Sequence, residues 1–149
     1  MPQLQSFNFR DRFIRHRNFE GILSSKRDGG PEADFSFALV SRGAGRVALR
    51  SANFPDHFLR HANFRIFLGK SSGPGDQLFE LDSTFFFERG LAASNGVSFR
   101  SVNFPDRYLR HRDFKLFLES KDSPNLAADA TFFRTQLIDD GTELHPVDE

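Results

Sequence analysis

Three observations predict an all-β fold made of three similar units. First, one pattern of Ser, Asn, Phe, Asp, Arg and His occurs three times in the 149 residues, at 6–19, 51–64 and 101–114. Second, the apolar stretches are short, rich in Phe and bounded by turn-forming residues, which is typical of strands. Third, each of the three repeats that contain this pattern holds four such stretches. Propellers need about four or more blades, so we predict a β-trefoil with pseudo-threefold symmetry.

The second repeat shows the expected elements in order. Its apolar stretches predict strands at 47–52, 58–61, 64–68 and 84–88. A turn at 53–56 follows the first strand, because Pro55 fixes φ there. The apolar alternation changes parity after Asn63, which places a tight hairpin turn at Ala62 and Asn63. By the same reasoning the other hairpin turns fall at 17–18 and 112–113.

The three copies account for nearly the whole chain. The first and third copies share nine of 14 residues, as do the second and third. We expect a single domain over 1–149, with repeats at about 1–45, 46–95 and 96–138 and a polar tail at 139–149. The chain contains 20 Phe but one Tyr and no Trp, which indicates a core built on Phe.

Composition excludes several classes of function. With 20 basic and 20 acidic residues the chain is neutral, so it lacks the charge of a nucleic-acid-binding protein. No apolar run is long enough to span a membrane, and no signal peptide is recognisable. We expect a cytoplasmic protein if the chain is complete and a secreted one if it is a module of a larger enzyme. The absence of Cys excludes disulfides, thiol nucleophiles and Cys-ligated metals.

Each copy carries an Arg-His pair, and an Asp follows this His by 18 to 21 residues. The parity of the strands places the His at a strand end beside the hairpin turn, and the Asp opens the fourth strand. A carboxylate can accept hydrogen bonds from two hydroxyls, and a neutral imidazole can donate or accept. Repetition of one small polar site suits a polymer binder better than an enzyme. The pairs are His16 with Asp34, His61 with Asp82, and His111 with Asp129.

The pattern N-F-P-x-x-[YF]-L-R-H-x-[ND]-F followed by D-[AS]-T-F resembles the arabinofuranose-binding domains, the family 42 carbohydrate-binding modules. The resemblance covers about 5–137 and implies a β-trefoil without catalytic activity. It implies binding of terminal L-arabinofuranosyl side chains of arabinoxylan or arabinan, possible fusion to a glycoside hydrolase, and no cofactor. In this family the pockets form around the His and Asp of these motifs. The first repeat departs from the pattern at Arg10, which replaces Pro, and in the segment Asp34-Phe-Ser-Phe37, which replaces D-[AS]-T-F.

Other repeated residues are expected to have structural roles. Strand parity points Arg15, Arg60 and Arg110 away from the His residues, so we expect them to pair with carboxylates such as Asp11, Asp56 and Asp106. The repeated Asn and Ser residues are interpreted as turn and bulge formers, at Asn8, Asn53, Asn103, Ser6, Ser51 and Ser101. Most Phe residues are assigned to the core. The hydroxyl of Tyr108 is a further candidate ligand contact in the third repeat.

The residues are also compatible with other interpretations. Each His could bond a backbone carbonyl while each Asp caps a turn. A metal site on the threefold axis lacks any local ligand spacing, and no two acids are marked as a glycosidase pair. A β-trefoil can also serve as a protein-interaction module or as a lectin for another ligand. The preferred prediction is a monomeric, non-catalytic carbohydrate-binding domain without metal, nucleic-acid or membrane partners.

Overall fold

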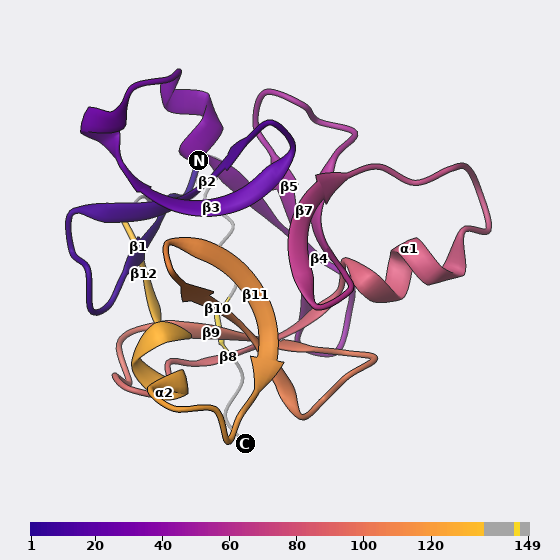
Figure 1. Ribbon diagram of the computed structural model, residues 1–149. Helices are drawn as coiled ribbons and strands as arrows, with labels where there is room; N and C mark the ends of the chain where they lie inside the picture. The colour runs from indigo at the N-terminus through magenta and orange to yellow at the C-terminus, as the bar shows by residue number, and fades with distance from the viewer. Residues whose placement is uncertain (136–144, 147–149) are drawn as a thin grey trace.

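The computed structural model describes residues 1–135, 145 and 146. The polar tail predicted at 139–149 therefore lies outside the described residues except for 145 and 146. In the described part, twelve strands form three groups of four, and the predicted β-trefoil is confirmed. Figure 1 shows the three groups as lobes around a common centre. No helix of the described part is long and apolar enough to cross a membrane.

Each repeat contributes four strands, with two short 3-10 turns in the first repeat and one short helix in each of the others. The first repeat holds β1 (Leu4–Ser6), β2 (Arg12–Arg17), β3 (Glu20–Ser25), the 3-10 turns η1 (Lys26–Asp28) and η2 (Glu32–Phe35), and β4 (Phe37–Ser41). The second holds β5 (Arg46–Ser51), β6 (Phe58–Ala62), β7 (Arg65–Gly69), α1 (Gln77–Asp82) and β8 (Phe85–Arg89). The third holds β9 (Val97–Ser101), β10 (Arg107–Arg112), β11 (Lys115–Ser120), α2 (Leu126–Asp129) and β12 (Phe132–Arg134). The helical segments were not predicted.

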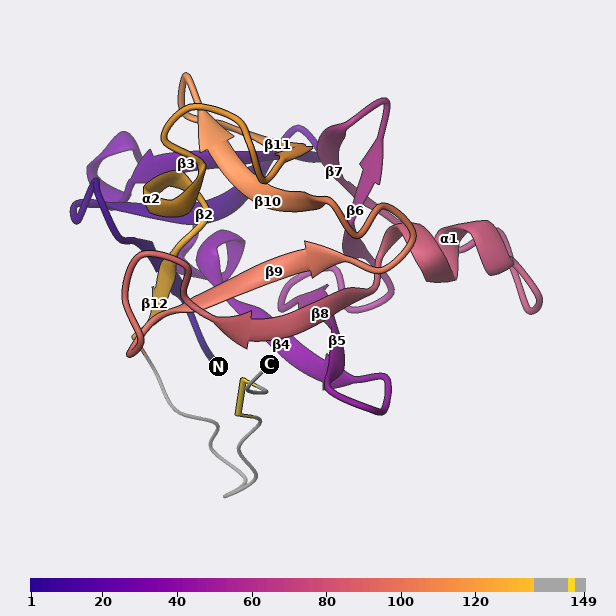
Figure 2. The same ribbon diagram turned by 90° about the horizontal axis from the view of Figure 1, so that it is seen from below.

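Six strands close a barrel, and three hairpins cover one end of it. The barrel runs β1–β12–β9–β8–β5–β4 and closes through the bridge between Gln3 and Ser36. The hairpins β2–β3, β6–β7 and β10–β11 contact each other through β3, β7 and β11. Figure 2 shows the hairpins as a layer on one side of β8 and β9. The arrangement places each hairpin beside its neighbour from the next repeat.

The core follows the threefold repetition of the sequence. Equivalent positions hold Ile14, Leu59 and Leu109, all fully buried. Where β3, β7 and β11 meet, the equivalent residues are Gly21, Ile66 and Leu116. A Cβ on Gly21 would lie 2.9 Å from Ile66 Cγ2 and 3.1 Å from Leu116 Cδ1. The first repeat therefore supplies no side chain at this point because the other two fill the space.

The tight hairpin turns lie one residue later than predicted. In β6–β7 the last paired residues are Ala62 and Arg65, so the turn consists of Asn63 and Phe64. Both have positive φ, 50° and 59°, as a two-residue type I′ turn requires. The turns at Asn18–Phe19 and Asp113–Phe114 have the same conformation. Phe64, predicted inside a strand, therefore lies at the tip of the hairpin.

Candidate functional site

The structure brings each predicted His and Asp together. His Nε2 lies 3.6 Å from the carboxylate in the pair His16–Asp34 and 3.3 Å in His61–Asp82. The distance in His111–Asp129 is 3.6 Å. The histidines lie near the ends of β2, β6 and β10, as expected. The same local arrangement recurs three times, and the first repeat has it despite its departures from the motif.

The carboxylates are carried by helical turns and not by the fourth strands. Asp82 is the last residue of α1 and Asp129 the last of α2, while Asp34 lies in η2. The prediction that these residues open the fourth strand was wrong, because each strand begins three residues after the Asp. A helical turn just before the strand brings the carboxylate back towards the end of the second strand. In α1, the Asp76 side chain caps this turn by accepting from the Phe79 N–H at 3.1 Å.

An asparagine of the following repeat connects each His to its Asp. We number each pocket by the repeat that supplies its His and Asp. In the first pocket, His16 Nε2 is 2.9 Å from Asn53 Oδ1, and Asn53 Nδ2 donates to Asp34 Oδ1 at 2.7 Å. The same two contacts occur in the other pockets, in His61–Asn103–Asp82 and in His111–Asn8–Asp129. Sequence reasoning interpreted these asparagines only as turn formers. Their occurrence in every copy was the available signal.

The asparagine determines which nitrogen of the histidine ring donates a hydrogen bond within the protein. Its NH₂ must face the Asp carboxylate, which only accepts, so its carbonyl oxygen faces the His. His Nε2 therefore carries the proton and donates it. In each pocket Nδ1 has no hydrogen-bond partner among the described residues, and it is not sealed from solvent. A neutral ring with its proton on Nε2 has Nδ1 as an acceptor for a ligand hydroxyl.

The arginines before each His pair with the same carboxylates. Arg15 Nη2 lies 2.8 Å from Asp34, Arg60 Nη2 lies 2.6 Å from Asp82, and Arg110 forms the corresponding ion pair with Asp129. The expectation of partners such as Asp11, Asp56 and Asp106 was therefore wrong. Parity fixes only the direction of Cβ. Each arginine Nε donates to the carbonyl of the next residue, so the side chain follows the strand and reaches the carboxylate.

The repeated serines form the predicted turns. The hydroxyls of Ser6, Ser51 and Ser101 accept from the backbone N–H three residues later at 3.0–3.1 Å. Each hydroxyl also donates to the asparagine side chain two residues later at 3.0 Å. The turn thereby orients the asparagine that the neighbouring repeat uses. These contacts confirm the predicted role of the serines as turn formers.

Two exposed Phe side chains lie beside each His. In the third pocket the rings of Phe9 and Phe114 are 5.2 Å apart, edge to face, and Phe9 also lies against His111 at 5.4 Å. The equivalent pairs are Phe19 with Phe54 and Phe64 with Phe104. All six rings are 37–47% exposed. Most Phe residues were assigned to the core, whereas these six form an apolar wall at the polar clusters.

The third pocket is a hollow of about 880 Å³. Its polar floor includes His111, Asp129 and Asn8, and its apolar wall includes Phe9 and Phe114. Tyr108 does not line it. Its side chain is buried, and its hydroxyl donates to Glu88 at 3.0 Å. The prediction that Tyr108 contacts a ligand was wrong, because its side chain is buried in a cluster with Leu126 and Ala130.

A family model, "Alpha-L-arabinofuranosidase B (ABFB) domain", matches residues 2–134. The chain belongs to this family. The ABFB domain is a carbohydrate-binding domain, so the resemblance found in the sequence is confirmed. A search of curated proteins found no significant match.

Solved structures similar to this ABFB domain confirm its fold. An arabinofuranosidase complexed with arabinofuranosyl-alpha-1,2-xylobiose matches with a TM-score of 0.76 and 23% identity, over 89% of this chain and 30% of that one. A lectin of Polyporus squamosus has a TM-score of 0.69 and 11% identity, over 91% of this chain and 48% of that one. The designed threefold-symmetric protein ThreeFoil has a TM-score of 0.70 and 11% identity, over 91% and 98%. The chain therefore spans about a third of the arabinofuranosidase.

The electrostatics of the ABFB domain favour a neutral His in the third pocket. Burial lowers the pKa of His111 below its ordinary value of 6.5 and outweighs the nearby Asp129 carboxylate, which raises this pKa. Arg110 lowers it further. A neutral ring agrees with Nε2 as donor and Nδ1 as acceptor.

Proposed function

We propose that this ABFB domain is a non-catalytic module that binds terminal L-arabinofuranosyl side chains of arabinoxylan or arabinan. The observation that carries the proposal is the threefold His–Asn–Asp arrangement beside two exposed Phe rings. The binding residues are His16 with Asp34, His61 with Asp82, and His111 with Asp129. The similar arabinofuranosidase complexed with arabinofuranosyl-alpha-1,2-xylobiose supports this ligand class.

The chemistry of a furanose matches the pocket. Vicinal hydroxyls donate hydrogen bonds, and His Nδ1 and the remaining lone pairs of the Asp carboxylate accept them. The apolar face of the ring can pack on the exposed Phe pair. Because each hydrogen bond to a ligand replaces one to water, one pocket binds weakly, with a Kd on the order of 0.1–10 mM. Several pockets on one polymer strengthen each other through effective concentration.

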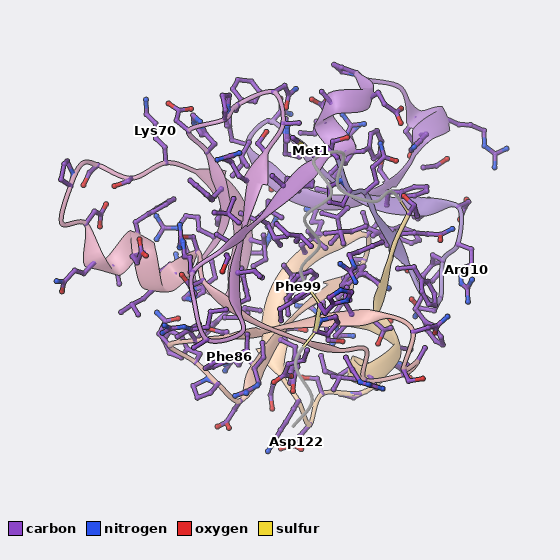
Figure 3. The ribbon with its side chains drawn as sticks, turned by 180° about the vertical axis from the view of Figure 1, so that it is seen from behind. Met1, Arg10, Lys70, Phe86, Phe99 and Asp122 are labelled. Carbon is purple, nitrogen blue, oxygen red and sulfur yellow. The ribbon has the colours of Figure 1, made fainter. Side chains whose placement is uncertain are left out.

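The test is a titration with methyl α-L-arabinofuranoside, followed by NMR at the backbone amides of each pocket. We expect saturable shifts around His61 and His111. The variant Asp129→Ala should weaken binding in the third pocket by roughly tenfold to a hundredfold, as the loss of a charged hydrogen-bond partner implies. The control Asp122→Ala removes an exposed acid outside the hollow, at the periphery in Figure 3, and should leave all shifts unchanged.

The variant also distinguishes binding from a merely structural role. Asp129 holds Arg110 and Asn8, so its removal destabilises the domain to some extent. Retained shifts at His61 in Asp129→Ala show that the domain is still folded, and His111→Gln serves as a second variant. If methyl α-L-arabinofuranoside causes no saturable shift at tens of millimolar, the proposal is wrong.

A further inference from the structure

The three pockets differ in how far their arginine is accessible. The side chains of Arg15 and Arg110 are 3% and 4% exposed, whereas that of Arg60 is 25% exposed. All three occupy equivalent positions and bind the equivalent carboxylate. The second pocket therefore presents part of a guanidinium group to solvent where the other two bury it.

The hydrogen bonds explain this difference. Arg15 Nη1 donates to the Gly29 carbonyl at 2.7 Å, and Arg110 Nη1 donates to Glu119 Oε1 at 3.1 Å. Arg60 donates through Nε to the His61 carbonyl and through Nη2 to Asp82. Its Nη1 has no acceptor among the residues that the structure describes. Both hydrogens of this nitrogen are available to a ligand.

A glycine in β7 leaves this arginine uncovered. The hairpin registers place Gly69 opposite Phe58 and Glu119 opposite Tyr108, so these two residues are equivalent. Glu119 binds both Arg110 and Arg112 in the third pocket. The second pocket lacks both of these charged side chains, because Gly69 stands at the position of Glu119 and Ala62 at the position of Arg112. A Cβ on Gly69 would lie 3.1 Å from Arg60 Cδ, so this glycine directly adjoins the arginine.

One other acid, Asp76, interacts electrostatically with Arg60 but forms no ion pair with its guanidinium group. Asp76 senses the charge of Arg60, which contributes to lowering the pKa of this carboxyl group. Its Oδ1 accepts from the Phe79 N–H, and its Oδ2 accepts from both the N–H and the hydroxyl of Ser72. Asp76 is therefore engaged in capping α1, and no ion pair joins it to Arg60 in the described part of the chain.

We propose that Arg60 makes the second pocket selective for an anionic sugar, binding the carboxylate of a uronic acid beside the residue held by His61 and Asp82. The inference rests on the proposed carbohydrate-binding function. A guanidinium has only donors, and its planar geometry fits a carboxylate. In the third pocket Glu119 already fills this place. The second pocket thus recognises a different decoration of a polysaccharide from the other two, whose arginines are buried.

The experiment compares methyl glucuronide with methyl glucoside, which differ in the carboxylate, by NMR at the Arg60 side chain and the amides of His61 and Gly69. We expect the glucuronide to bind at least about fivefold more tightly, and about 0.5 M salt to reduce this difference. Gly69→Glu should place a carboxylate on Arg60 and abolish the preference. Gly69→Gln, which has the same size without the charge, is the matched control and should retain it.

The reverse exchange tests the third pocket. Glu119→Gly should give that pocket a preference for the glucuronide, because Arg110 loses an acceptor. Equal affinity of the two glycosides in the wild type, or an unchanged preference in Gly69→Glu, would overturn the inference. Binding of methyl α-L-arabinofuranoside is measured in the same samples, so failure of the proposed function is seen separately.

Discussion

At the scale of single residues, the asparagine determines what the pocket can accept. Asn8, Asn53 and Asn103 turn each His so that Nε2 donates within the protein and Nδ1 remains an acceptor. A protonated His would have two donors and lose this acceptor. The pocket therefore depends on a neutral ring, which burial favours in the third repeat.

The pKa of His111 predicts a pH dependence of stability. Because this pKa is lower in the folded protein than its ordinary value of 6.5, the unfolded chain binds a proton more readily. The contribution of His111 to the free energy of unfolding is complete above pH 6.5 and is lost as the pH falls below it. Urea unfolding at about pH 7.5 and about pH 5 should show a smaller decrease in His111→Gln than in the wild type. Equal decreases in the two proteins would contradict this assignment.

At the scale of elements, the hairpin turns place the aromatic wall. Each turn puts a Phe in the left-handed region, with φ of 59–60°. This conformation costs roughly 1 kcal/mol for a residue with a side chain. Contacts beyond the hairpin offset the cost, since Phe64 packs on Phe104 and the Arg107 guanidinium lies 3.8 Å from its ring centre. The turn was predicted one residue early because the parity change alone does not locate its second residue.

The turn predicts the effect of substitutions at Asn63. Asn63→Val should lower the free energy of unfolding by about 1–2 kcal/mol, because a β-branched residue is strained at positive φ. Asn63→Gly should change it by less than about 0.5 kcal/mol, because Gly adopts this conformation readily. Urea unfolding of the two variants checks the difference. A similar stability of both would show that the turn tolerates another conformation.

At the scale of the whole molecule, the pockets lie between repeats and close the chain into a ring. The second repeat supplies Asn53 to the first pocket, and the third supplies Asn103 to the second. The first repeat supplies Asn8 to the third pocket, 121 residues away from Asp129. The pairing of β1 with β12 brings these ends together. No single repeat contains a complete pocket.

This arrangement predicts which pocket each asparagine serves. Asn8→Ala should weaken sugar binding by roughly fivefold to a hundredfold in the third pocket, around His111. It should leave the first pocket intact although Asn8 belongs to the first repeat. Asn53→Ala is the matched variant and should affect the first pocket instead. NMR titration of both variants with methyl α-L-arabinofuranoside measures this. Loss of first-pocket binding in Asn8→Ala would contradict the cyclic arrangement.

The sequence by itself determined the trefoil, the order of its strands, and which His and Asp of each copy lie together. These features depend on local patterns of apolar residues and on motifs repeated within one repeat. Only the tertiary structure decided that Asn8, Asn53 and Asn103 cross to the neighbouring pocket, that six Phe rings are exposed, and that Arg60 is uncovered. Such contacts join residues of different repeats or depend on one missing side chain, so the pattern within a single repeat does not specify them.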